Sequence, residues 1–258
     1  MTYNIEKGQV RGTIVFIHGN SSSSFVFDEV LKCKSIPQTK IAVDLPGHGI
    51  NANLGHEVKD FSIEVYRAKL IDLLSRIDDD ILLVGNSLGG HLVIEVAQEV
   101  NRLKGLVIFG TPPLKKPLNL EEAFLPVDAL QTFFTENPTD TEIESAIHQA
   151  LYNKENAHIL IKDFKLANPK VRKAITMDVA EDKFLDQYAI FTNLELPKFI
   201  IAGKQDPSVN PEYLEMIENK SVKTCELIKF EDCGHYPSIE KPKEFIDTLN
   251  KIVLKTFY

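Results

Sequence analysis

The sequence predicts an α/β fold in which a mostly parallel, doubly wound sheet is interrupted by a helical segment. Over residues 1 to about 110, short apolar runs alternate with helix-length segments, which is the pattern of strand–helix–strand units. From residue 112 to about 194 the apolar runs stop and several short helical patterns replace them. We therefore expect a core domain formed by residues 1–111 and 195–258, with a helical insertion at 112–194.

Six short runs predict the strands of this sheet. They are rich in β-branched and other apolar side chains and lie beside glycines or charged turns. Near-continuous apolar runs are typical of strands covered by helices on both faces, and hence of a parallel sheet. In chain order the runs are 14–17, 40–43, 81–84, 106–109, 198–201 and 223–230.

Local signals also mark several helices. Ser62 can cap a helix that extends from Ile63 to about Ile77 with an apolar stripe on one face. Within the insertion, the capping-box pattern from Thr141 to Glu144 predicts a helix that continues to Leu151. A final helix is expected over residues 243–254.

Composition excludes several classes of protein. The 258 residues include 29 Lys and Arg against 37 Asp and Glu, for a net charge of −8, so no basic footprint for nucleic acid is present. The three cysteines do not resemble a disulfide framework, and neither a secretory signal nor a bilayer-length apolar run is visible. We expect a cytoplasmic protein with free thiols, a monomer or homodimer, that binds neither nucleic acid nor a membrane.

The strongest signal of chemistry is Gly85-Asn86-Ser87-Leu88-Gly89, which lies between an apolar run and a helical pattern. A serine flanked by glycines at a strand-to-helix turn is typical of a nucleophile whose hydroxyl stands free above the sheet. The glycines are needed because the neighbouring backbones leave no room for side chains. We therefore expect Ser87 to be the catalytic nucleophile.

Two backbone N–H groups are expected to stabilise the oxyanion that forms when Ser87 attacks a carbonyl carbon. The turn His18-Gly19-Asn20 follows the first strong strand and can place the N–H of Asn20 opposite the N–H of Leu88. These two groups form the predicted oxyanion hole. A plain glycine turn is the alternative interpretation, and His18 itself is expected to orient the loop rather than to react.

An acid and a base are expected later in the chain. Asp206 follows the run 198–201 and His235 follows the run that ends at Phe230, so both lie at the carboxyl edge of the sheet. His235 would take the proton of Ser87, while Asp206 would hold the imidazole in the correct tautomer and stabilise its charged form. A turn or helix-capping role is the alternative for Asp206.

The other histidines are expected to have structural roles. His91 lies four residues beyond Ser87 on the same predicted helix, where packing is the expected role. No pair of histidines has a metal-ligand spacing such as H-E-x-x-H, and no glycine-rich phosphate loop is present. The sequence therefore predicts neither a metal site nor a cofactor.

Taken in order, five segments resemble the landmarks of the α/β-hydrolase superfamily. They are His18-Gly19-Asn20, Asp44-Leu-Pro-Gly-His-Gly49, Gly85-Asn-Ser-Leu-Gly-Gly90, Gly203-Lys-Gln-Asp206 and Gly234-His235. The resemblance covers nearly the whole chain and implies an α/β-hydrolase fold whose helical cap is inserted after the sixth core strand. It also implies a serine esterase or lactonase-like enzyme.

Residue by residue, the family's serine, acid and base match Ser87, Asp206 and His235, and its two backbone donors match Asn20 and Leu88. One departure is the N-terminus. Only about a dozen residues precede the first strong run, so the family's first edge strands are expected to be shortened or partly missing.

Aromatic side chains of the insertion, together with one that follows the oxyanion turn, are candidates for an apolar substrate pocket. The alternative is that the insertion's aromatic side chains only pack its helices together. The candidates are Phe25, Phe124, Phe133, Phe134, Tyr152, Phe184 and Tyr188.

Several activities share the predicted triad. Hydrolysis of a small, apolar carboxylic ester, thioester or lactone needs only the residues already named. One alternative is a C–C bond hydrolase of diketones from ring cleavage, whose elbow resembles 85–90 but whose relatives usually carry a tryptophan near the histidine, and this chain has none. Another is a small-molecule receptor with a hydrolase fold.

Overall fold

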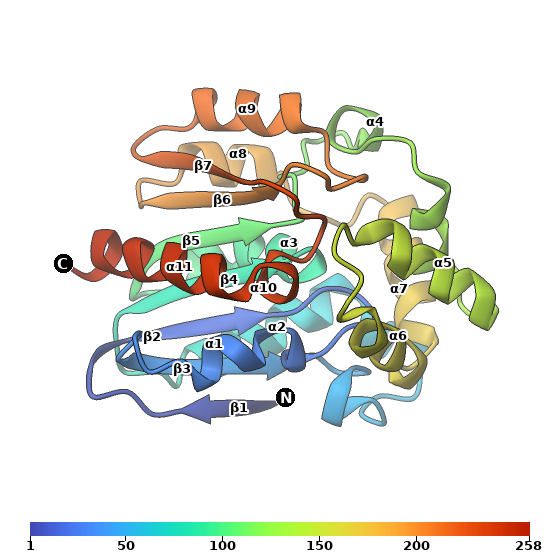
Figure 1. The fold of residues 1–258 in the computed structure, drawn as a ribbon, viewed down its shortest axis with the longest axis horizontal. Helices are drawn as coiled ribbons and strands as arrows, with labels where there is room; N and C mark the ends of the chain where they lie inside the picture. The colour runs from blue at the N-terminus through green and yellow to red at the C-terminus, as the bar shows by residue number, and fades with distance from the viewer.

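Seven strands form one sheet in the order β1-β3-β2-β4-β5-β6-β7 (Figure 1). The computed structural model describes residues 1–258, except for the side chains at positions 129 and 130. All neighbouring strands are parallel apart from β1 and β3, which are antiparallel. The strands are β1 Thr2–Glu6, β2 Val10–Ile17, β3 Gln38–Asp44, β4 Ile81–Asn86, β5 Leu103–Phe109, β6 Lys198–Gly203 and β7 Cys225–Phe230.

The predicted fold class is confirmed. Five of the six predicted runs lie within β2 to β6, and the sixth, 223–230, begins two residues before β7. The sheet contains one strand that was not predicted, β1. It pairs with β3, with Thr2 opposite Asp44 and Glu6 opposite Lys40. Four of its five residues are exposed. Because β1 is an edge strand without an apolar run, periodicity could not reveal it.

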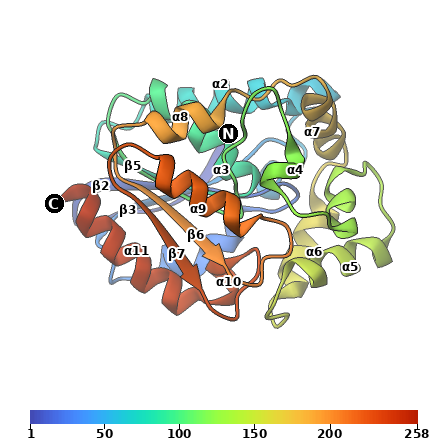
Figure 2. The same cartoon turned by 90° about the horizontal axis from the view of Figure 1, so that it is seen from above.

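Helices cover both faces of the sheet, as the near-continuous apolar strands predict. Alternate residues of β2 face opposite layers: Val15 and Ile17 pack with Leu92 of α3, while Ile14 and Phe16 pack with Leu249 of α11. Figure 2 shows α2 and α8 on one side of the sheet and α11 on the other. The first layer contains α2 Ile63–Leu74, α3 Leu88–Val96, α8 Gln187–Asn193 and α9 Pro211–Lys220; the second contains α1 Asp28–Lys32, α10 Pro237–Glu240 and α11 Pro242–Phe257.

The helical insertion leaves the sheet after β5, the fifth strand of this chain, and returns at β6. Figure 1 shows its helices gathered beyond the carboxyl ends of the parallel strands. The predicted range 112–194 also includes α8, but α8 packs against α3 and α9 in the layer beside the sheet. The insertion contains α4 Leu120–Ala123, η5 Asp128–Phe134, α5 Asp140–Ala150, α6 Ala157–Leu166 and α7 Lys170–Ala180, where η denotes a 3₁₀ helix. The other 3₁₀ helices are η1 Ser24–Phe27, η2 Gly49–Asn51, η3 Val58–Phe61 and η4 Ala97–Glu99.

The first residues of α2 and α5 can be compared with the helix caps that the sequence predicts. Ser62 caps α2 as predicted, and its hydroxyl accepts a hydrogen bond from the N–H of Val65 at 3.4 Å. The predicted capping box of α5 was wrong by two residues, because Thr139 and Glu142 form it. The sequence contains two overlapping Thr-x-x-Glu patterns, and the earlier one adds a further half turn to the helix.

Candidate active site

Ser87 occupies a strained turn between β4 and α3. Its backbone has φ 50° and ψ −119°, a combination that a residue with a side chain rarely adopts. Its N–H donates to the carbonyl of Phe109 at 2.9 Å, which anchors the turn to the neighbouring strand. A Cβ on Gly85 would lie 2.4 Å from the carbonyl oxygen of Gly89, and one on Gly89 would lie 2.1 Å from that of Ile17. The two glycines therefore permit the close packing that holds Ser87 in place.

Asp206 and His235 form a buried pair at the carboxyl ends of β6 and β7. Nδ1 of His235 and Oδ2 of Asp206 are 2.8 Å apart, and their side chains are 9% and 7% exposed. The other carboxylate oxygen of Asp206 accepts from the hydroxyl of Ser208 at 2.6 Å and from its N–H at 2.9 Å. Each oxygen of Asp206 thus has a partner that holds the carboxylate in position.

Asp206 and His235 each stabilise the charged form of the other. Burial by itself would lower the pKa of His235, but the charge and hydrogen bond of Asp206 outweigh burial and raise that pKa above 6.5. Burial would likewise raise the pKa of Asp206, but His235 and Ser208 together lower it below 3.8. Because an ionised carboxylate only accepts, Nδ1 of His235 carries the proton and Nε2 is free to act as a base.

Glycine makes room for the imidazole. Gly110, directly after β5, has φ +60°, and a Cβ there would lie 2.7 Å from Cε1 and 2.8 Å from Nε2 of His235. The N–H of His235 donates to the carbonyl of Ala150 at the end of α5, at 2.8 Å. The imidazole of His235 is therefore positioned by the sheet on one side and by the insertion on the other.

Glu240 holds the turn that carries His235. Its buried carboxylate accepts backbone hydrogen bonds from both neighbours of His235, Gly234 and Tyr236, at 3.0 Å each. It also accepts from the N–H groups of Tyr152 and Asn153 at 2.8 and 3.0 Å. One carboxylate thus ties the histidine turn to the turn that follows α5. Glu240 was not predicted, because two of its four partners, Tyr152 and Asn153, are distant along the chain and no local motif marks the other two.

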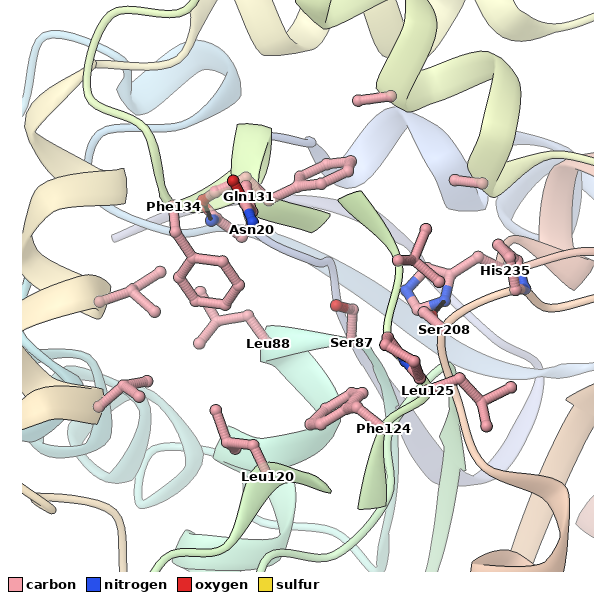
Figure 3. A pocket seen from close by; sticks show the side chains of 18 of the residues that line it. Asn20, Ser87, Leu88, Leu120, Phe124, Leu125, Gln131, Phe134, Ser208 and His235 are labelled. Atoms are coloured by element: carbon pink, nitrogen blue, oxygen red, sulfur yellow. Dashed lines mark hydrogen bonds between the residues drawn. The ribbon is translucent and has the colours of Figure 1, made fainter. Parts of the chain in front are cut away.

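Ser87 and His235 both line one pocket of about 850 Å³ (Figure 3). Four of the predicted pocket residues also line it: Phe124, Phe133, Phe134 and Phe184. Additional lining residues that were not predicted include Leu114, Leu120, Ser208 and Tyr236. Most of the apolar side chains in this wall belong to the insertion, whereas Ser208 and Tyr236 come from the turns after β6 and β7.

Three predicted pocket residues need correction, because they do not line the pocket. Phe25 is 51% exposed on η1, and Tyr152 is 52% exposed in the turn whose backbone faces Glu240. Tyr188 lies on α8, where the ammonium of Lys115 sits 5.6 Å from its ring centre. Aromatic character alone could not show on which side of its element each ring would lie.

The predicted oxyanion donors lie at the pocket. Asn20 and Leu88 both line it, and among the described residues neither backbone N–H has an acceptor. A Cβ on Gly19 would lie 3.1 Å from Cβ of Ser87, so this turn passes directly beside the serine. The side-chain amide of Asn20 donates to the carbonyl of Phe133 at 2.7 Å, which joins the turn to the insertion.

Arg172 of α7 fastens the oxyanion turn from the other side. Its guanidinium donates to the carbonyls of Thr135 and Glu136 at 2.9 and 2.8 Å, and to the hydroxyl of Ser21 at 3.1 Å. It also stacks on Phe164, 4.5 Å from the ring centre. Burial lowers its pKa to about 10, so the group remains charged at neutral pH. Arg172 is a structural clamp rather than an anion site.

Three further features bear on function: possible metal sites, the state of the cysteines, and helices that could cross a membrane. Among the residues that the structure describes, no three His, Cys, Asp or Glu side chains gather closely enough to hold a metal ion. Cys33, Cys225 and Cys233 are free thiols. Within the described part of the chain, no helix combines the length and apolar character that crossing a membrane requires.

Comparison with known proteins gives one family match and several relatives. A family model described as the alpha/beta hydrolase family matches residues 14–248. A pimeloyl-[acyl-carrier protein] methyl ester esterase of Nitrosomonas europaea is 24% identical over 252 residues, covering 93% of this chain and 94% of that protein. Methylesterase 9 of Arabidopsis thaliana is 26% identical over 259 residues, covering 93% and 98%.

Solved structures share the fold. The N-acyl homoserine lactonase AidH has a TM-score of 0.88 at 23% identity, covering 99% of this chain and 94% of that one. An esterase from Exiguobacterium antarcticum has a TM-score of 0.79 at 15% identity, covering 98% and 94%. At these identities the likeness concerns the fold alone.

Proposed function

The chain belongs to the alpha/beta hydrolase family, and from that premise we propose that it is a serine hydrolase that cleaves a carboxylic ester, thioester or lactone. Ser87 is the proposed nucleophile, His235 the general base and Asp206 the group that orients it. The observation that carries the proposal is the buried 2.8 Å pair of Asp206 and His235, of which His235 lines one pocket with the strained Ser87. The relatives named as esterases and a lactonase support the same reaction class.

In the proposed mechanism, Ser87 Oγ attacks the carbonyl carbon while Nε2 of His235 takes its proton. The N–H groups of Asn20 and Leu88 donate to the oxyanion of the tetrahedral intermediate. The imidazolium then returns the proton to the leaving oxygen or sulfur, and an acyl-enzyme forms. A water activated by His235 releases the acid and restores the serine.

The pocket supports an apolar acyl group as the substrate's main feature. Phe124, Phe133, Phe134 and Phe184 line it together with aliphatic side chains. At about 25 cal/mol per Å² of apolar area removed from water, each added methylene should strengthen binding until the pocket is filled. We therefore expect kcat/KM to rise with acyl length and then to fall.

The proposal is tested with p-nitrophenyl esters of increasing acyl length, using the wild-type protein and Ser87→Ala in parallel. Wild type should show turnover with a clear length optimum, and Ser87→Ala should lose at least about 10⁴ in kcat. Melting curves of both proteins show whether any loss reflects unfolding. Equal rates for the two proteins contradict the proposed nucleophile. No turnover by folded wild type contradicts the ester reaction and favours the C–C hydrolase or receptor alternatives.

A further inference from the structure

One polar side chain in the apolar part of the pocket has no role in the proposed mechanism. His91 lies on α3, one turn after Ser87, and lines the same pocket. Its ring is flanked by Phe124 and Phe184, with ring centres 6.4 and 5.9 Å away. The position of His91 in the sequence predicts a packing role, but packing alone does not account for a titratable ring at the pocket wall.

The side chain of Gln187 determines which nitrogen of His91 carries the proton. Nδ1 of His91 lies 2.7 Å from Oε1 of Gln187, which also accepts from the N–H of Leu114 at 3.2 Å. The amide nitrogen of Gln187 donates to Oε1 of Glu95 at 2.8 Å. A backbone N–H can only donate, and a carboxylate can only accept. The contacts with Leu114 and Glu95 therefore both require that the amide oxygen of Gln187 faces Leu114 and His91 and that its nitrogen faces Glu95. Nδ1 of His91 must therefore be the donor.

Glu95 is itself held in place. The same oxygen accepts from the N–H of Leu185 at 2.9 Å, and the second oxygen pairs with Arg67 at 3.2 Å. The Glu95 side chain is buried. Hydrogen bonds thus connect Arg67 to Glu95, Glu95 to Gln187, and Gln187 to Nδ1 of His91. The other ring nitrogen of His91 has no partner among the described residues.

That last nitrogen, Nε2 of His91, carries a lone pair. Burial, partly opposed by the hydrogen bond with Gln187, lowers the pKa of His91 to about 4, so the ring is neutral at pH 7. Among the described residues Nε2 has no hydrogen-bond partner. Unlike Nε2 of His48, which is sealed from solvent, Nε2 of His91 is accessible, and the residue as a whole is 9% exposed. The pocket therefore presents one fixed acceptor beside the nucleophile.

We propose that Nε2 of His91 accepts a hydrogen bond from an N–H or O–H group of the substrate and selects esters that carry such a donor. This inference rests on the proposed function, because it concerns the substrate of the same pocket. A ligand without the donor leaves the acceptor unpaired in an apolar environment, which weakens its binding. At the usual strength of a neutral hydrogen bond, the preference should be about tenfold.

The test measures binding rather than turnover. Calorimetry compares N-hexanoylglycine methyl ester with its N-methyl counterpart, N-hexanoylsarcosine methyl ester, on Ser87→Ala protein. The glycine ester should bind about tenfold more tightly. Adding His91→Phe, which fills the space without an acceptor, should bring the ratio of the two affinities close to one. Adding His91→Gln, which restores an acceptor oxygen, should recover part of the preference.

A second readout needs no change at position 91. In Ser87→Ala protein, the ¹⁵N signal of His91 Nε2 should shift on saturation with the glycine ester and not with the sarcosine ester. An unchanged affinity ratio in the His91→Phe protein, failure of both esters to bind, or no selective shift of this signal overturns the inference. Because binding to Ser87→Ala does not depend on turnover, these results are separate from failure of the ester reaction itself.

Discussion

Backbone strain at single residues marks the candidate site. Ser87 has φ 50° although it carries a side chain, a conformation that costs on the order of 1–3 kcal/mol. Gly110 has φ +60° and faces the imidazole of His235. Both positions lie at the ends of neighbouring strands, where a rigid sheet can maintain them. The strained turn positions the proposed nucleophile, Ser87, and Gly110 leaves room for its proposed base, His235.

The pH dependence of activity follows from the shifted pKa of His235. Since the general base must be neutral and Asp206 raises its pKa above 6.5, kcat/KM should fall as pH decreases through a midpoint above 6.5. Asp206→Asn removes that charge, so burial then dominates and the midpoint should move below 6.5, while kcat falls by about 10⁴. Profiles of kcat/KM for both proteins check this. A midpoint that does not move on substitution contradicts the assigned pair.

Gly110→Ala tests the space beside the imidazole. The added Cβ would lie 2.7 Å from Cε1 of His235, so the ring must move, and we expect a loss of about 10² in kcat. The positive φ adds a destabilisation of about 1 kcal/mol. Gly105→Ala is the control, because Gly105 lies in β5, the strand that Gly110 directly follows, and its Cβ would meet Thr256 at 3.1 Å, away from the site. Equal activity of the two variants contradicts the positioning role of Gly110.

Between elements, buried charged groups join the helical insertion to the turns of the candidate site. Glu240 of α10 holds the turn of His235 against the chain that follows α5. Arg172 of α7 holds the oxyanion turn against the chain that follows η5. In both cases a side chain satisfies backbone groups at the ends of short elements. The insertion therefore supports the geometry of the candidate site as well as lining the pocket.

Arg172→Met tests this connection while keeping much of the side chain's apolar stem. Loss of the guanidinium leaves the carbonyls of Thr135 and Glu136 without their donor, so stability should fall by about 1.5–3 kcal/mol. The loosened oxyanion turn should lower kcat more than it raises KM. Lys173→Met, at the next and more exposed position of α7, is the control and should change neither quantity appreciably. Thermal melting and steady-state kinetics check both variants, and identical behaviour contradicts the clamp.

At the scale of the whole molecule, the charge distribution favours neutral substrates. The chain has a net charge of −8, and Glu121 and Asp128 are the charged residues that line the pocket among those the structure describes. No lysine or arginine in the described part of the chain lines it. An anionic substrate therefore meets like charge on approach and finds no cation to pair with inside.

This arrangement predicts discrimination between esters of similar length. The p-nitrophenyl monoester of adipic acid, which carries a carboxylate, should have a kcat/KM at least about tenfold below that of p-nitrophenyl hexanoate. Raising the salt concentration toward about 1 M shortens the screening length to about 3 Å and should narrow the difference. Steady-state kinetics at low and high salt check this. Equal rates for the two esters contradict the inferred effect of pocket charge.

Much of the molecule was predictable because its signals are local. Apolar runs placed six strands, and the elbow at Ser87 was visible from its glycines, because steric limits apply within a few residues. The capping box of α5 was misplaced where two equivalent patterns overlap. Strand β1 was not predicted, because nearly all of its residues are exposed and no buried face of the strand carries a repeating pattern of apolar side chains.

The sequence by itself determined the sheet, the helical insertion and the order of the candidate residues, since periodicity and turn chemistry act along the chain. Only the tertiary structure decided which side chains meet. It placed Asp206 2.8 Å from His235, removed Phe25, Tyr152 and Tyr188 from the pocket, and gave His91 a free acceptor. These contacts join segments that are distant in sequence, and their geometry depends on how whole elements pack. A pattern along one chain carries no record of that packing.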